Sequence, residues 1–116
     1  MRDLTAIQAR YLRDALPIRL GGLAANLSRI KSASANDLNR PAVESMIEES
    51  KWFIEWTARD AEIDVAAQLV ELQLQLAHWW HRFDDIWNDP AKRQDMIDRA
   101  GAWSQRVLEM SGLLQR

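Results

Sequence analysis

The segment MIDRAGAWSQRVLEMSGLL, residues 96–114, decides the fold that this sequence predicts. Its apolar residues recur at alternating steps of four and three, which places them on one stripe of an α-helix. They are Met96, Ala100, Trp103, Val107, Met110 and Leu114. A second stripe of mostly smaller residues runs beside it and consists of Ile97, Gly101, Ser104, Leu108 and Ser111. A face of this width can contact two neighbouring helices, as a helical bundle requires.

The N-terminal part of the chain predicts a helix over residues 4–31 that is interrupted at Pro17. Proline has no backbone N–H and disfavours helix in the residue before it, so a kink or break is expected there. Gly21 and Gly22 weaken the helix by about 1 kcal/mol each relative to alanine. Close approach of a neighbouring helix would compensate for this loss.

Two more helices are expected in the middle of the chain. A loop over residues 32–41 leads into a second helix from about Pro41 to Trp56, since proline suits the first helical turn. The third helix is expected to begin after a capping signal at Thr57 or Asp60.

The third helix contains no Gly or Pro, and we expect it to run unbroken to Trp87, about 40 Å at 1.5 Å per residue. Asp89 then caps the last helix, and Pro90 occupies its first position. Short connections make consecutive helices antiparallel. The sequence thus predicts one all-α domain: an up-down four-helix bundle over residues 17–116 with an N-terminal helical arm over residues 1–16.

Composition narrows the class of protein. The chain has 116 residues, of which 47% are hydrophobic and 28% charged, as in an ordinary globular domain. It has no cysteine, which excludes disulfides and thiolate metal sites. A net charge of −2 with scattered arginines argues against a nucleic-acid partner. No segment approaches the roughly 20 apolar residues of a membrane span or resembles a signal peptide, so we expect a cytoplasmic location.

The second helix contains KWFIEW, residues 51–56, and raises the main functional question. Its core stripe is expected to contain Val43, Met46, Ile47, Phe53, Ile54 and Thr57. At 100° per residue, Trp52 lies about 160° and Trp56 about 120° from that stripe. Neighbouring exposed indoles form a patch that something should cover. The N-terminal arm, a second copy of the protein and another partner are the three possible covers.

The third helix carries more apolar surface than one core can bury. Its main stripe consists of Val65, Leu69, Leu72, Leu76, Trp80, Phe83 and Trp87. A second stripe about 120° away contains Ile63, Ala67, Val70, Leu74, Ala77 and His81. A helix that is apolar on nearly every side is central in its domain or buried in an oligomer, and two-fold homodimers are the commonest assembly. The candidate interface residues are therefore Trp52, Trp56, Ile63, Val70 and Leu74.

Signatures of catalysis are missing from the sequence. It has no Gly-rich phosphate loop, no G-x-S-x-G and no H-E-x-x-H. The two histidines, His78 and His81, lack the Glu-x-x-His pairs of di-iron bundles. Adjacent carboxylates such as Asp84 and Asp85 point about 100° apart on a helix and do not form a catalytic dyad. We therefore expect no catalytic, cofactor-binding or metal site.

Two hypotheses about function follow. The leading one is a non-enzymatic helical interaction module that self-associates or docks a protein partner through its apolar, tryptophan-bearing face. The alternative is a bundle that binds a small ligand or cofactor, because such sites are apolar cavities with a few polar groups. Its pocket would contain Gln73, Trp79, Trp80, His81, Phe83 and Trp103.

Four runs of sequence resemble a small family of uncharacterised bacterial helical proteins, chiefly cyanobacterial. They are LPIRLGGLAANLSRIKS, ESKWFIEWTA, AAQLVELQLQLAHWW and WSQRVLEMSGLL. The similarity covers most of the chain from Leu16 onward. The resemblance implies a compact helical bundle and no particular chemistry.

Overall fold

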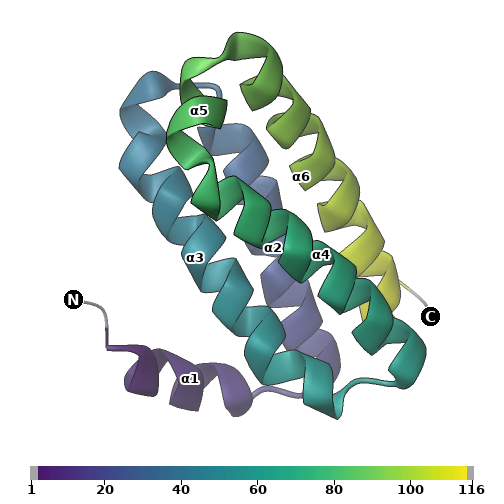
Figure 1. Cartoon of the computed structure of the whole chain (residues 1–116). Helices are drawn as coiled ribbons and strands as arrows, with labels where there is room; N and C mark the ends of the chain where they lie inside the picture. The colour runs from purple at the N-terminus through teal and green to yellow at the C-terminus, as the bar shows by residue number, and fades with distance from the viewer. Residues whose placement is uncertain (1–2, 115–116) are drawn as a thin grey trace.

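The structure is a computed structural model that describes residues 3–114 (Figure 1). The described chain is 88% helical without strands, which confirms the predicted all-α class. Two short 3₁₀ turns cover residues 37–39 and 58–60. The α-helices are α1 (Leu4–Leu12), α2 (Leu16–Ala33), α3 (Arg40–Thr57), α4 (Ile63–His81), α5 (Phe83–Asn88) and α6 (Pro90–Ser111).

The four long helices α2, α3, α4 and α6 run along the length of the molecule (Figure 1). Helix α5 lies at one end, and α1 lies across the other. Helix α2 packs against both α3 and α6, and α4 packs against α3. Contact between α4 and α6 is sparse, which leaves room for a cleft between these two helices.

Apolar side chains from all four long helices form the interior. The most deeply buried include Leu23, Leu27, Ile30, Val43, Ile47, Ile54, Leu69, Leu72, Leu76, Met96 and Val107. Met96, Ala100 and Val107 are the buried part of the stripe predicted for the last helix. Leu114 of that stripe is 58% exposed, because α6 ends before it at Gly112, whose φ is 76°.

Of two local signals, the cap at Asp89 acts as the sequence predicts, whereas the close approach expected at Gly21 and Gly22 is found only at Gly21 and comes from a side chain beyond the end of α6. The Asp89 carboxylate accepts hydrogen bonds from two backbone N–H groups in the first turn of α6, at 3.0 and 3.2 Å, and Pro90 is the first residue of that helix. Gly21 lies where another part of the chain comes close. A Cβ atom at this position would be 2.7 Å from the Leu113 side chain.

The interruption expected at Pro17 falls a few residues earlier, at residues 13–15. Pro17 is accommodated in the first turn of α2, where its missing N–H leaves no helical hydrogen bond unmade. The predicted loop is also shorter than expected. Helix α2 continues to Ala33, and α3 begins at Arg40.

The prediction of one unbroken third helix is wrong. The chain leaves helical geometry at Arg82 (φ −107°, ψ 23°), which separates α4 from α5. The break redirects the following turn so that Phe83, Ile86 and Trp87 are only 3, 6 and 3% exposed. Burial of these large side chains stabilises a bend for which the sequence has no Gly or Pro signal.

The predicted start of that helix is also wrong. Helix α4 begins at Ile63, with Glu62 before it, and residues 58–60 form a 3₁₀ turn instead. Thr57 is the last residue of α3, and its hydroxyl bonds to Tyr11 rather than capping a helix. Asp60 pairs with Arg19 of α2 at 3.0 Å.

Arg93 of α6 joins three parts of the chain. Its guanidinium donates two hydrogen bonds to the Trp87 carbonyl, at 2.9 and 2.6 Å, and lies 4.0 Å from the centre of the Trp87 ring. It also donates to the Ser34 carbonyl at 3.5 Å and to the Asp37 carboxylate at 2.6 Å. These contacts fix the end of α5 and the turn after α2 against α6.

Candidate interaction surface

Helix α1 covers part of the aromatic surface of α3. The Tyr11 ring stacks on Phe53 and lies 5.9 Å from the Trp56 ring, measured between centroids. The Tyr11 hydroxyl donates to the Arg19 carbonyl at 2.9 Å and is hydrogen-bonded to the Thr57 hydroxyl at 3.0 Å. Burial raises the pKa of Tyr11 to about 12. Tyr11 therefore joins α1 to both α2 and α3.

The two tryptophans of KWFIEW have different environments. Trp56 is 5% exposed, so it does not contribute to the surface on which the sequence predicted it. Its cover is the N-terminal arm, through Tyr11. Trp52 stacks on Trp56 with 6.0 Å between ring centroids and remains 37% exposed. Trp52 thus forms the outer edge of an aromatic cluster whose other members are covered.

Helix α4 has a stripe of exposed apolar side chains on the side away from the core. Ile63, Val70 and Leu74 are 84, 50 and 69% exposed. The opposite side of α4 is anchored by residues that include Leu69 and Leu72, both 0% exposed. Three large members of the second stripe predicted for this helix are therefore largely uncovered by residues of the described range. We call Ile63, Ala66, Ala67, Val70, Leu74 and Ala77 the α4 stripe.

A groove of about 270 Å³ lies beside the α4 stripe, between α3 and α4. Trp52 and Trp80 form its apolar walls. The Lys51 ammonium lies 5.6 Å from the centre of the Trp80 ring, a cation–π distance. The Gln73 amide donates to the Glu55 carboxylate at 3.2 Å. Gln73 thus has an acceptor within the protein and joins the two helices.

The residues of the predicted ligand pocket do not share one cavity. Gln73 and Trp80 line the groove between α3 and α4, and Trp80 also borders a second hollow together with His81 and Phe83. The other members border three different hollows: His81 and Phe83 at the junction of α4 and α5, Trp79 between α4 and α6 near α5, and Trp103 farther along α6. The six residues expected to form one pocket therefore border several hollows, and the largest group that shares one is Trp80, His81 and Phe83.

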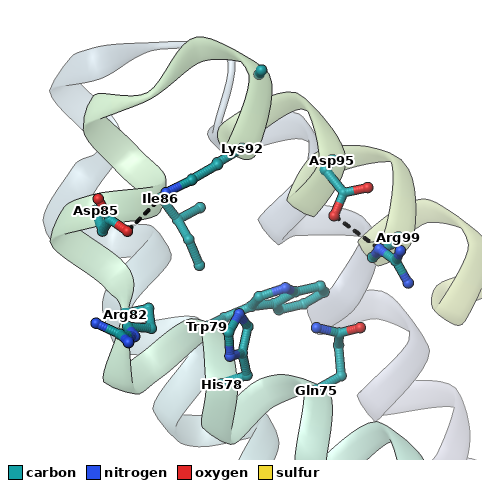
Figure 2. A pocket seen from close by; sticks show the side chains of 10 residues that line it. Gln75, His78, Trp79, Arg82, Asp85, Ile86, Lys92, Asp95 and Arg99 are labelled. Carbon is teal, nitrogen blue, oxygen red and sulfur yellow. Dashed lines mark hydrogen bonds and ion pairs between the residues drawn. The ribbon is translucent and has the colours of Figure 1, made fainter.

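The hollow that contains Trp79 is the largest of these, about 740 Å³, and is not one the sequence predicted (Figure 2). It lies between α4, α5 and α6. Two ion pairs line its α6 side, Asp85 with Lys92 at 2.9 Å and Asp95 with Arg99 at 2.8 Å. The hydrogen bond from Lys92 lowers the pKa of Asp85, and the same bond raises the pKa of Lys92.

Within residues 3–114, no three His, Cys, Asp or Glu side chains are grouped as metal ligands. Nor does this part of the chain contain a helix that is both long and apolar enough to span a bilayer. No family model, curated protein or solved structure matches this chain.

Proposed function

We propose that this protein is a non-enzymatic helical interaction module, an up-down four-helix bundle whose α4 stripe binds a second copy of the chain. The observation that carries the proposal is the exposure of Ile63, Val70 and Leu74 on one side of α4. Three large aliphatic side chains in a row on one helix are a patch of the kind that marks protein interfaces.

The pattern of large and small residues favours a second copy as the occupant. If two α4 helices pair antiparallel with Val70 at the two-fold axis, Ile63 faces Ala77 of the partner subunit. Leu74 then faces Ala66 of the partner subunit. Ile63 and Leu74 thus each meet an alanine, so the two identical surfaces are complementary, as a two-fold interface requires.

The size of the stripe sets the expected strength of the dimer. Helix α4 has 19 residues and is about 28 Å long at 1.5 Å per residue. One helix stripe of that length buries less than the roughly 800 Å² per partner of a standard stable interface. Trp52, beside the stripe, adds an aromatic anchor of the type enriched at interface centres. We expect a reversible dimer rather than an obligate one.

Sedimentation velocity over about a hundredfold range of protein concentration tests the proposal, because a reversible dimer dissociates on dilution. Val70→Glu places two carboxylates at the two-fold axis and should make the protein monomeric throughout the range. Ile18→Glu is the matched control, since Ile18 is also 50% exposed but lies on α2. This variant should associate like the wild type.

A monomeric wild-type protein at every concentration would refute self-association through α4. So would equal dissociation by Val70→Glu and Ile18→Glu. Circular dichroism of both variants establishes that they are folded. Leu74→Ser, which introduces no charge, provides a second test of the same stripe and should weaken the dimer to a smaller extent.

A further inference from the structure

The cleft between α4, α5 and α6 is rich in hydrogen-bond donors that have no acceptor among residues 3–114. Gln75, His78, Trp79 and Arg82 lie on one side of α4 and at its end, at spacings of three, one and three residues. None of these four side chains forms a hydrogen bond or an ion pair with another residue in the range 3–114. Figure 2 shows Gln75, His78 and Trp79 next to one another beneath α6.

Trp79 is the most informative of the four. Its side chain is only 2% exposed, yet its indole N–H has no acceptor among the described residues. Among residues 3–114, the fully buried side-chain nitrogen that lacks a hydrogen-bond partner is Nε of Arg19, and not the indole nitrogen of Trp79. The nitrogen of Trp79 must therefore reach the cleft, where it meets solvent or a ligand. A nearly buried donor directed into a cavity is a feature of a binding site, since buried polar groups are normally paired.

The opposite wall strengthens the donor character of the cleft. Lys92 and Arg99 of α6 each bond to one aspartate, which leaves further N–H groups on both side chains. Together with Arg82, they outnumber the carboxylates of Asp85 and Asp95 by three to two. This local excess of positive charge is opposite in sign to the net charge of the whole chain, −2.

We propose that this cleft binds a small organic anion, a carboxylate or phosphate monoester attached to a flat apolar body. The anionic oxygens accept hydrogen bonds from Arg82 and its donor neighbours on α4. The apolar body lies against Trp79 and Ile86, which form the floor. A volume of about 740 Å³ is ample for such a molecule. The site lies on a different side of α4 from the α4 stripe and does not depend on dimerisation.

NMR of the ¹⁵N-labelled indole groups tests this proposal with three named probes: benzoate, phenyl phosphate and the neutral benzamide. The Trp79 indole signal is identified by its loss in Trp79→Phe. Benzoate or phenyl phosphate should shift this signal in a saturable manner, and the stronger of the two identifies carboxylate or phosphate as the preferred group. Benzamide has the same ring without the charge and should bind at least tenfold more weakly, as expected when a charge-assisted hydrogen bond is lost.

Arg82→Gln should weaken binding of the preferred anion by about tenfold or more. Arg59→Gln is the control, because it removes the same charge from an exposed residue outside the cleft. His78→Ala provides a second variant at an exposed position, where folding is not at risk. The proposal is overturned if neither anion shifts the Trp79 signal, if benzamide binds as tightly, or if Arg59→Gln weakens binding as much as Arg82→Gln.

Discussion

The Tyr11 ring stacks on the Phe53 ring with 7° between their planes and 4.1 Å between their centroids. Tyr11→Ala removes this stack and both hydrogen bonds of the hydroxyl, so we expect a loss of about 3 kcal/mol in the free energy of unfolding. Tyr11→Phe keeps the ring and should lose only about 1 kcal/mol. Urea denaturation measures both values. A loss for Tyr11→Ala no larger than for the exposed-site control Arg10→Ala would contradict the role assigned to Tyr11.

The stability of the protein should fall at high pH because of the same residue. Burial raises the pKa of the folded-state hydroxyl to about 12 from its ordinary value of 10.0. The unfolded chain therefore loses this proton first, and the stabilisation is complete below pH 10 and disappears as the pH rises to about 12. A shift of this size corresponds to about 3 kcal/mol.

Tyr11 is the single tyrosine of the chain, so the ultraviolet absorbance of tyrosinate follows its ionisation directly. A titration midpoint at the ordinary value in the folded protein would show that the hydroxyl is not buried. Denaturation at a series of alkaline pH values then provides the stability curve. Tyr11→Phe should have no such decline in the same pH range.

Two glycines should respond to alanine in opposite directions. Gly21→Ala places a methyl group close to Leu113, but Leu113 is 45% exposed and can move aside. The gain in helix propensity should then stabilise the protein by about 0.5 kcal/mol. Gly112→Ala forces alanine into a left-handed conformation, φ 76°, and should destabilise by about 1 kcal/mol. Thermal denaturation measures whether each substitution stabilises or destabilises the protein. Destabilisation by Gly21→Ala would mean that the Leu113 side chain cannot move aside.

The proposed two-fold axis can be tested by cross-linking, because the chain contains no cysteine. Val70→Cys places two thiols next to each other at the axis and should form an intersubunit disulfide under mild oxidation. Ile18→Cys is equally exposed but lies on α2, outside the proposed interface, and should remain monomeric. Non-reducing gel electrophoresis distinguishes the two. Equal cross-linking of both variants would indicate random collision rather than a defined pair.

Salt should strengthen the proposed dimer. Glu55, Glu62 and Asp64 are exposed near the α4 stripe, and α4 itself contains no lysine or arginine. Two such surfaces repel each other when they approach, and the Debye length falls from about 30 Å at 0.01 M salt to about 3 Å at 1 M. The dissociation constant from sedimentation should therefore decrease as sodium chloride is added. An increase in the dissociation constant would indicate instead that a pair of opposite charges lies across the interface.

The sequence predicts well those features that depend on near neighbours in the chain. The cap at Asp89 follows from the residue types at the helix start, and the buried positions Met96, Ala100 and Val107 follow from their spacing. The break at Arg82 could not be predicted in this way, because it depends on how deeply Phe83 and its neighbours can be buried by other helices.

The two candidate surfaces also differ in how far they can be predicted from the sequence. The α4 stripe is visible in the sequence because Ile63, Val70 and Leu74 share one side of a single helix. The environment of Trp56 is not visible, since it depends on where α1 docks. The anion cleft is also hidden, because Lys92 and Arg99 come from α6, whereas Arg82 lies at the end of α4. A helical period would have revealed Gln75, His78 and Arg82 together, but not the wall that faces them.

Arg93 serves in this cysteine-free chain as a reversible cross-link between segments that are more than fifty residues apart in sequence. A disulfide stabilises mainly by restricting the unfolded chain, whereas a guanidinium clamp acts only after the three segments have met. Its whole contribution therefore belongs to the native state and should slow unfolding more than it speeds folding. Lysine at this position would keep the charge, yet a single ammonium cannot reach the Trp87 and Ser34 carbonyls and stack on the indole at the same time.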